Sequence, residues 1–157
     1  MAFLLPILLV LLAGAYDFGR AYYLRIEVTN AARAGAQYGC QSTATATDTT
    51  GIKNAANADA YDVPLASGST SALTFPTVPT ITCQCVPNTG GAGTTASCTS
   101  PGCTSGTNHF VEWLTVYTQY TYTPLIPWNW ASFGMNFSIP ATIQLNGQAT
   151  MRIASVD

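Results

Sequence analysis

The stretch MAFLLPILLVLLAGAY, Met1–Tyr16, runs directly into DFGRAYYLRIEVTNAARAGAQYG, Asp17–Gly39. The first stretch carries no charge, and as a helix it would span about 24 Å, somewhat less than a bilayer core. The second stretch has no proline and a helix-forming composition. The sequence therefore predicts one long helix over residues 1–39, apolar all round at first and amphipathic afterwards, which carries the rest of the chain as a head.

A secretory signal peptide is an alternative for this apolar start, since it also has a short apolar core. The sequence shows no basic residue ahead of the core and no small-x-small cleavage site before Asp17. The helical pattern also continues beyond the place where a signal peptide would be cut. A retained membrane helix is the better interpretation, with Phe18, Tyr22 and Tyr23 at the membrane interface.

Small residues gather in two parts of the predicted helix, around Gly14 and around Gly35. Glycine costs about 1 kcal/mol relative to alanine inside a helix, whereas small side chains let two helices approach closely. Pro6 should kink the helix near its start. These features favour a helix packed in a bundle over a lone anchor. The residues predicted to pack between subunits are Leu4, Pro6, Leu8, Leu12, Gly14, Phe18 and Gly19.

Charged residues enter the helix only from Asp17 onward. Asp17 and Arg20 stand three residues apart, so they share a helix face and can form an ion pair. On a surface that pair would contribute a few tenths of a kcal/mol, about 0.2–0.5. Between neighbouring copies of the helix, an unpaired charge would be costly and the charges would specify the register. The residues assigned to register are Asp17, Arg20, Arg25, Glu27 and Arg33.

Several segments now in view carry a resemblance to a known family. FLLPILL (Phe3–Leu9), DFGRA (Asp17–Ala21) and TNAARAGAQY (Thr29–Tyr38) resemble the N-terminal region of TadE-like pilins, from the tight-adherence (Tad) branch of type IV filaments. VYTQYTYTPLIP (Val116–Pro127) and ATMR (Ala149–Arg152) resemble the closing tyrosine-rich strand, proline turn and terminal strand of that family. The resemblance covers roughly half of the chain, and the middle part resembles nothing known to us.

The resemblance implies a subunit that its helix inserts in the inner membrane and that then polymerises into an extracellular helical filament on the cell surface. It implies a prepilin peptidase that removes a short basic leader, and an assembly ATPase with its inner-membrane platform. The family carries an acidic residue just inside the mature end. Alignment on Pro6 places that residue immediately before Met1, so we expect either a mature end upstream of Met1 or a subunit that lacks the acidic residue.

The composition supports an assembly subunit and gives no support to a nucleic-acid partner. Charged residues make up 8% of the 157 residues, against about 25% in ordinary soluble domains. The formal net charge is −2, and a nucleic-acid partner would need a basic stripe. Threonine, serine, glycine and asparagine dominate the polar positions, which suits the outer shell of an assembly.

The head is predicted to begin with a loop over residues 41–51, followed by a short helix over Ile52–Tyr61. Asp48–Thr50 offer the cap of that helix. Its apolar face is thin, because it consists of Ile52, Ala56 and Ala60, so we expect the helix to lean on the head without holding it together. Residues 88–108 are rich in glycine, serine and threonine and predict a long loop.

Three extended segments follow in the predicted head. Leu73–Val86 contains prolines that confine it to a sheet edge or make Ile81 its start. His109–Thr123 alternates apolar residues on both faces, which predicts a strand between the long helix and another layer. Asn146-Gly147 is a usual hairpin turn, yet the apolar residues of Ile139–Ile153 keep one parity, which favours a single strand through Gly147, with or without a bulge.

These elements predict an α+β fold, in which the long N-terminal hydrophobic helix packs on a small antiparallel sheet of three to four strands. The sheet should lie on the C-terminal half of the helix. We divide the chain into the helix, residues 1–39, and a globular head, residues 40–157, whose loop 83–108 is stapled by disulfides.

The odd number of cysteines predicts two disulfides and one free thiol. Disulfides are the default in an exported chain, and Cys83 and Cys85, two residues apart on one strand face, should not join each other. We expect them to pair with Cys98 and Cys103, with Cys40 left as a free thiol or an intermolecular partner. Zinc bound by the same four cysteines, or with a histidine in place of one, is the alternative. The Cys-x-Cys spacing is tight for a zinc knuckle.

The sequence offers little for catalysis. His109 is the one histidine of the chain, and Glu112 is a lone carboxylate beside it. There is no Gly-x-Ser-x-Gly elbow and no phosphate-binding glycine motif. We therefore predict no enzymatic activity and no cofactor.

The sequence thus predicts a structural pilin, with the cysteine loop and the loop holding Trp128 and Trp130 as contacts to neighbours, surfaces or sugars. A minor or adhesive tip pilin would share every one of these features. A membrane-anchored periplasmic binding domain would instead keep its helix in lipid. A path for electrons along the helix is a further alternative, although aromatic residues there are more often packing residues. Its aromatic residues would be Tyr16, Phe18, Tyr22, Tyr23 and Tyr38.

Overall fold

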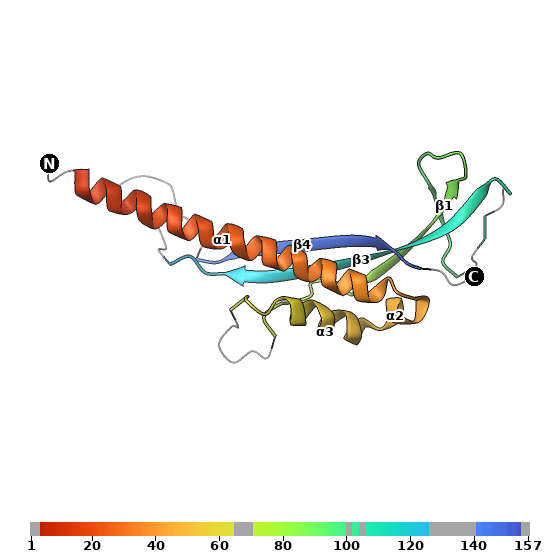
Figure 1. Cartoon of the computed structure of the whole chain (residues 1–157), viewed down its shortest axis with the longest axis horizontal. Helices are drawn as coiled ribbons and strands as arrows, with labels where there is room; N and C mark the ends of the chain where they lie inside the picture. Colours follow the sequence, from red (N-terminus) through yellow and green to blue (C-terminus); the bar gives the residue numbers. More distant parts are fainter. Residues whose placement is uncertain (1–3, 65–70, 100–101, 104–105, 126–140, 155–157) are drawn as a thin grey trace.

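A computed structural model describes residues 4–64, 71–99, 102–103, 106–125 and 141–154. Its elements in chain order are α1 (Leu4–Gly39), α2 (Thr43–Thr47), α3 (Thr49–Asp59), β1 (Thr80–Pro87), β2 (Thr94–Ala96), β3 (Asn108–Tyr122) and β4 (Ile143–Arg152). The strands form one antiparallel sheet on which α1 lies, so the predicted α+β fold is confirmed (Figure 1).

Helix α1 is one continuous element, as predicted, and its first turns project beyond the end of the sheet (Figure 1). The helix runs through Pro6 without interruption, so Pro6 does not open the described helix, and the kink expected there stays a prediction. Pro6 lies in the first turn of α1, where backbone N–H groups have no acceptor within the helix. Proline at such a position removes no helical hydrogen bond.

The strand order in the sheet is β2-β1-β3-β4. The first half of β3 pairs with β1 and the second half with β4, and every pairing is antiparallel. The ladder of β3 and β4 runs without a break from Trp113↔Arg152 to Tyr122↔Ile143. One strand therefore passes through Gly147, as the parity of its apolar residues predicts, and it has neither a hairpin turn nor a bulge there.

Two short elements contradict the loops predicted for their positions. Residues 43–47 form α2, because Ser42 and Thr45 exchange side-chain and backbone hydrogen bonds in a capping box. Residues 94–96 form β2, which pairs with β1 beside the Cys83–Cys98 disulfide. Three to five residues are too few to show a hydrophobic period, so local contacts decide these elements.

The cap of α3 is the one predicted. The Gly51 backbone N–H donates to Asp48 Oδ1 at 2.9 Å, and the Tyr38 hydroxyl donates to Asp48 Oδ2 at 2.9 Å. These hydrogen bonds, the backbone one first, hold the pKa of the Asp48 carboxyl below its usual value. The helix begins at Thr49, three residues before the predicted start, and it packs on α1 with Ile52 and Ala56 fully buried.

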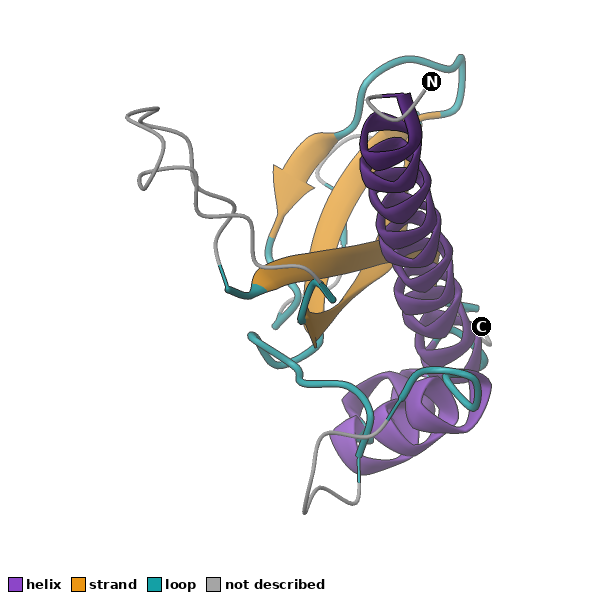
Figure 2. Cartoon of the chain, turned by 90° about the vertical axis from the view of Figure 1, so that its left-hand side faces the viewer, coloured by secondary structure: helices purple, strands orange, loops and turns teal. Residues whose placement is uncertain are grey.

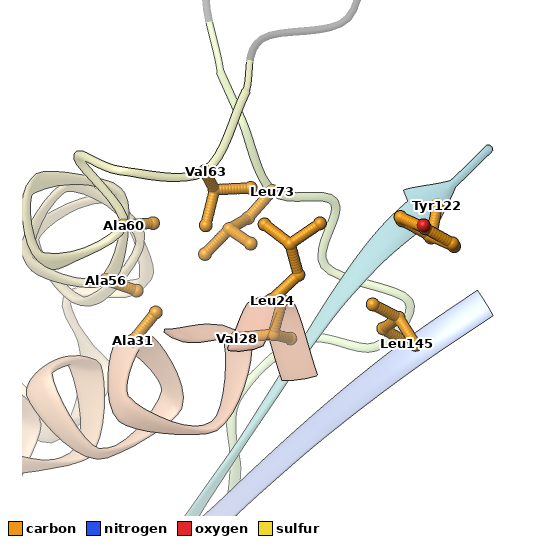
Figure 3. Packing of buried hydrophobic residues seen from close by; sticks show 9 residues of the cluster. All are labelled: Leu24, Val28, Ala31, Ala56, Ala60, Val63, Leu73, Tyr122 and Leu145. Carbon is orange, nitrogen blue, oxygen red and sulfur yellow. The ribbon is translucent and has the colours of Figure 1, made fainter. Parts of the chain in front are cut away.

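The core fills the space between the second half of α1, helix α3 and one face of the sheet (Figure 2). Figure 3 shows one cluster, in which Leu24 and Val28 of α1 meet Ala56 of α3 and the following Ala60 on one side and Leu145 of β4 on the other. The opposite face of β3 carries Trp113 and Tyr117, both half-buried. The described residues include no helix or second sheet on that face, so the expected further layer is absent from this part of the chain.

Candidate functional site: the exposed half of α1

The first half of α1 leaves its large apolar side chains exposed on every side. Their exposed fractions range from 42% for Ile26 to 74% for Phe18. Monomeric soluble proteins rarely expose a contiguous apolar surface of this kind. Where such a surface occurs, it marks a site of interaction with protein or membrane. The exposed residues are Leu4, Leu5, Ile7, Leu8, Leu9, Val10, Leu11, Leu12, Tyr16, Phe18, Tyr22, Tyr23 and Ile26.

The predicted subunit-packing residues lie in this exposed half. Leu8 and Leu12 are about 60% exposed, at 58% and 61%. Side chains added at Gly14 or Gly19 would meet no other atom within 4 Å. The backbone of Pro6 belongs to the same helix. Neither glycine therefore packs against another part of the described chain.

The second half of α1 is used in the opposite way. Val28, Ala31, Ala32 and Ala36 have no exposed surface. A Cβ on Gly35 would lie 3.1 Å from the Ile52 carbonyl oxygen, so the glycine lets α3 approach closely. The small residues of this half thus serve packing within the chain. On the sequence alone, they count among the residues that favour a bundle of helices.

Asp17 lies within the exposed half of α1 and binds the end of the sheet. Its carboxylate accepts a short hydrogen bond from the Tyr122 hydroxyl and a second one, at 3.3 Å, from the Leu125 backbone N–H. Burial first, and then the neighbouring Asp17 carboxylate, raise the pKa of Tyr122 to about 12. We call this group, with Arg20, the Asp17 latch.

Arg20 completes the latch from the next turn of α1. One guanidinium nitrogen lies 3.8 Å from Asp17 Oδ1, which confirms the predicted pair, and the guanidinium carbon lies 5.6 Å from the centre of the Tyr122 ring. Asp17 is therefore engaged by its own head. No sequence pattern singles out Tyr122, although a carboxylate in a largely apolar helix needs a hydrogen-bond donor.

The remaining register charges lie on the exposed side of α1. Arg25 and Arg33 are exposed and form no ion pair among the described residues. Both line a shallow hollow of about 320 Å³ with Tyr22 and Ile26. Glu27 and Arg33 line a second hollow, of about 280 Å³, which extends to Asp59 at the end of α3. Arg25, Glu27, Arg33 and Asp59 thus form a group that holds both signs of charge, which we call the charged collar.

The cysteines pair as Cys83–Cys98 and Cys85–Cys103, and Cys40 is free. The predicted staple of the loop is confirmed, and the pairing that the sequence left open is settled. All four thiols proposed as zinc ligands are consumed by these bonds. Cys40 is half-buried at the end of α1, where its thiol donates to the Gln37 carbonyl oxygen at 3.3 Å.

The other predicted site residues have simpler surroundings. The His109 ring lies 2.9 Å from the Asn88 side-chain oxygen, in a contact that joins the two ends of the loop. Glu112 belongs to no metal-binding group, because the described residues contain no cluster of three His, Cys, Asp or Glu side chains that could hold a metal ion. Trp128 and Trp130 fall outside the described residues.

With this geometry in place, a comparison with protein families identifies the exposed helix. Residues 1–37 match the family model described as TadE-like protein. The match confirms the family resemblance for the N-terminal helix. It covers the whole exposed half of α1 and the Asp17 latch residues on that helix. Nothing matches among curated proteins or among solved structures.

The TadE-like segment also has the physical character of a membrane anchor. Within the described chain, one helix segment, Ile7–Gly39, is long and apolar enough to cross a bilayer, with a mean hydropathy of 1.3. Only 6% of its most apolar window is buried inside the chain. A helix at the core of a soluble domain would be mostly buried, so this one has its apolar surface available for lipid or for protein.

Proposed function

We propose that this chain is a structural pilin, which polymerises through α1 into an extracellular filament of the Tad type. The observation that carries the proposal is that the apolar surface left exposed on α1 coincides with the TadE-like segment. Before assembly the helix holds the subunit in the inner membrane. In the filament the same surface is buried among the helices of neighbouring subunits.

Once the subunit leaves the bilayer, burial of α1 among neighbouring helices keeps its apolar surface out of water, which stabilises the assembly by about 25 cal/mol for each Å². Because the first half of α1 is exposed all round, it offers contacts to several neighbours at once. Gly14 and Gly19 leave room for close approach of a second helix. A helix that is surrounded by copies of itself satisfies both features.

The charged collar fixes how far one subunit is displaced along the next. Arg25 and Arg33 lie exposed on the outer side of α1, and Glu27 and Asp59 provide the opposite charge nearby. A subunit shifted by one turn would bury these charges without partners, at a cost of several kcal/mol. Asp17 and Arg20, held in the latch, instead set the position of the head on its own helix.

The family resemblance adds the partners of assembly. A prepilin peptidase trims the precursor, and an ATPase with its inner-membrane platform extracts the subunit from the bilayer. The head then forms the outer wall of the filament, where the disulfide-bonded end of the sheet faces away from the exposed half of α1 (Figure 1).

Mass spectrometry and N-terminal sequencing of filaments sheared from cells test the proposal. We expect this chain as the dominant species, with a trimmed end. A photocrosslinking amino acid at Phe18 should then give chain-to-chain adducts within filaments. The same amino acid at Tyr61, which is 89% exposed but lies on the head, is the matched control and should give fewer.

Two other outcomes separate the alternatives. A chain found only in the membrane fraction, with an uncut leader and lipid adducts at position 18, would make it an anchored periplasmic binding domain. A chain present in sheared filaments at a few copies would make it a minor or tip pilin.

A further inference from the structure

The face of the sheet that points away from α1 carries an ordered array of uncharged polar side chains. Directly opposed residues of β3 and β4 join across the strands in four hydrogen-bonded rungs. The rungs are Thr115–Thr150 at 3.0 Å, Tyr117–Gln148 at 3.3 Å, Gln119–Asn146 at 2.9 Å and Thr121–Gln144 at 3.0 Å. We call this array the rung face.

A hollow of about 420 Å³ lies between the two middle rungs. Thr118 and Gly147 form its floor, where the backbones of β3 and β4 pair. The walls are the Tyr117–Gln148 rung, the Gln119–Asn146 rung and Pro76. None of the lining residues is charged, and Asn146 and Gln148 are exposed to solvent.

The rungs hold their side chains ready for a ligand. Each side-chain amide has two N–H donors and a carbonyl oxygen with two lone pairs, and a rung uses only part of that capacity. The Gln119 amide donates to Asn146, and this rung leaves further donors and acceptors of both amides unused, on two residues that line the hollow. Side chains already fixed by each other lose little rotamer freedom when a ligand binds.

We propose that this hollow binds a neutral sugar chain of pyranose units. A pyranose has an apolar C–H face, which packs on the half-buried Tyr117 ring and on Pro76, and a rim of hydroxyls that both donate and accept. The amides of Gln119, Asn146 and Gln148 complement that rim. The absence of charge from the lining excludes a site built for phosphate, sulfate or carboxylate groups.

The strand direction gives the site room for an extended chain. Trp113 lies on the same face as Tyr117, four residues earlier on β3, which corresponds to about 13–14 Å along the strand. Its indole N–H is buried and has no hydrogen-bond partner among the described residues. A sugar chain that lies along β3 therefore passes from the hollow towards a second aromatic side chain. Sugar binding at this hollow does not depend on polymerisation, so a single subunit should bind the sugar chain.

Calorimetric titration of the full chain, held in micelles of a detergent without a sugar headgroup, tests the site. The probes are cellohexaose, maltohexaose, mannohexaose and chitohexaose, with an oligogalacturonate as the anionic counterpart. We expect at least one neutral probe to bind and the anionic one to bind far more weakly. Failure of all four neutral probes to bind would overturn the proposal.

Variants then locate the binding. Tyr117→Ala, and the double variant Gln119→Ala with Asn146→Ala, should each weaken binding about tenfold or more. The matched control is Thr121→Ala with Gln144→Ala, which removes a rung of the same chemistry outside the hollow and should leave affinity unchanged. Equal loss in the control would overturn the assignment to the hollow.

Filament yield, measured on the same variants, separates this site from the proposed pilin function. We expect the hollow variants to assemble normally. If they fold but fail to assemble while sugar affinity stays unchanged, the rung face is a contact between copies of the chain and the sugar site is refuted. If the wild-type chain binds sugar but never forms filaments, the pilin function fails and the sugar site stands.

Discussion

The two halves of α1 belong to one helix but relate to the rest of the molecule in opposite ways. Phe18 is 74% exposed, whereas Val28, less than three turns further on, has no exposed surface. The glycines differ in the same sense. Gly14 and Gly19 have no neighbour within 4 Å, while a Cβ on Gly39 would press on Leu114 and lie 3.0 Å from Ile52.

The difference shows that the head covers the apolar surface of only one half of α1. The buried half has small residues because the sheet and α3 lie close against it. The exposed half has large apolar residues that stay largely exposed, with glycines between them whose added Cβ would meet no other described atom within 4 Å. A surface of that composition is stable only in lipid or among other helices, and the proposed function supplies both environments.

Gly147→Val attacks the buried half and should have the largest effect. A Cβ at this position would lie against the Val28 carbonyl oxygen and 2.6 Å from Thr118 Oγ1. Thr118 also donates a 2.7 Å hydrogen bond to that carbonyl oxygen, so the variant must lift α1 from the sheet and lose this bond. We expect a loss of about 4 kcal/mol or more in unfolding free energy, measured by denaturant titration of tryptophan fluorescence.

Gly19→Val is the matched control in the exposed half. Because nothing lies within 4 Å of Gly19, its unfolding free energy should stay within about 0.5 kcal/mol of the wild-type value, but filament yield should fall. Normal filaments from this variant would show that the small residues of the exposed half are not packing sites.

Loss of the Cys83–Cys98 disulfide tests whether assembly merely follows stability. The double variant Cys83→Ser with Cys98→Ser opens a loop with a sequence separation of 15, far from the exposed half of α1. We expect a loss of about 3 kcal/mol in unfolding free energy, from the greater entropy of the unfolded chain. The fraction that remains folded should still assemble. If it does not, then stability of the head limits polymerisation and the two halves of α1 are not independent.

Sequence patterns predicted the parts of the fold that rest on long periods. The helix over 1–39, the strand over 109–123 and the strand through Gly147 each have ten or more residues of consistent pattern, and α1, β3 and β4 confirm them. The Asp48 cap and the set of disulfide-bonded cysteines were also predictable, because both follow from local chemistry.

The rest depended on contacts between distant parts of the chain. The latch joins Asp17 to Tyr122 across 105 residues, and no pattern in either segment points to the other. The alanines of residues 31–36 suit packing on another helix or on a sheet equally well, so only the position of α3 shows which partner they have. The α2 and β2 elements are too short for a period to reveal.

The Asp17 latch, which ties the exposed half of α1 to the sheet, should make the head sensitive to high pH. Tyr122 has a pKa of about 12 in the folded chain, against 10.0 for an ordinary tyrosine. A raised pKa stabilises the fold below pH 10 and loses that contribution as the pH rises towards 12. The linked free energy is about 2–3 kcal/mol. Tyr122→Phe should be destabilised by about 2 kcal/mol at neutral pH, because Asp17 loses a donor.

Titration of tyrosinate absorbance checks the latch directly. The wild-type chain should contain one more late-titrating tyrosine than Tyr122→Phe, and the fall in unfolding free energy between pH 10 and 12 should be smaller in the variant. Equal falls in both chains would mean that Tyr122 does not hold Asp17 in solution.

Arg25→Ala and Arg33→Ala should have the smallest effect on stability and the clearest consequence for assembly. Both side chains are exposed and form no ion pair among the described residues, so unfolding free energy should change by less than about 0.5 kcal/mol. If the collar sets the register between subunits, filaments of the double variant should be fewer or irregular by electron microscopy. Gln37→Ala, an exposed uncharged position on the same helix, is the control. Regular filaments from the double variant would leave apolar packing alone to set the register, and the exposed half would then carry the whole of the assembly information.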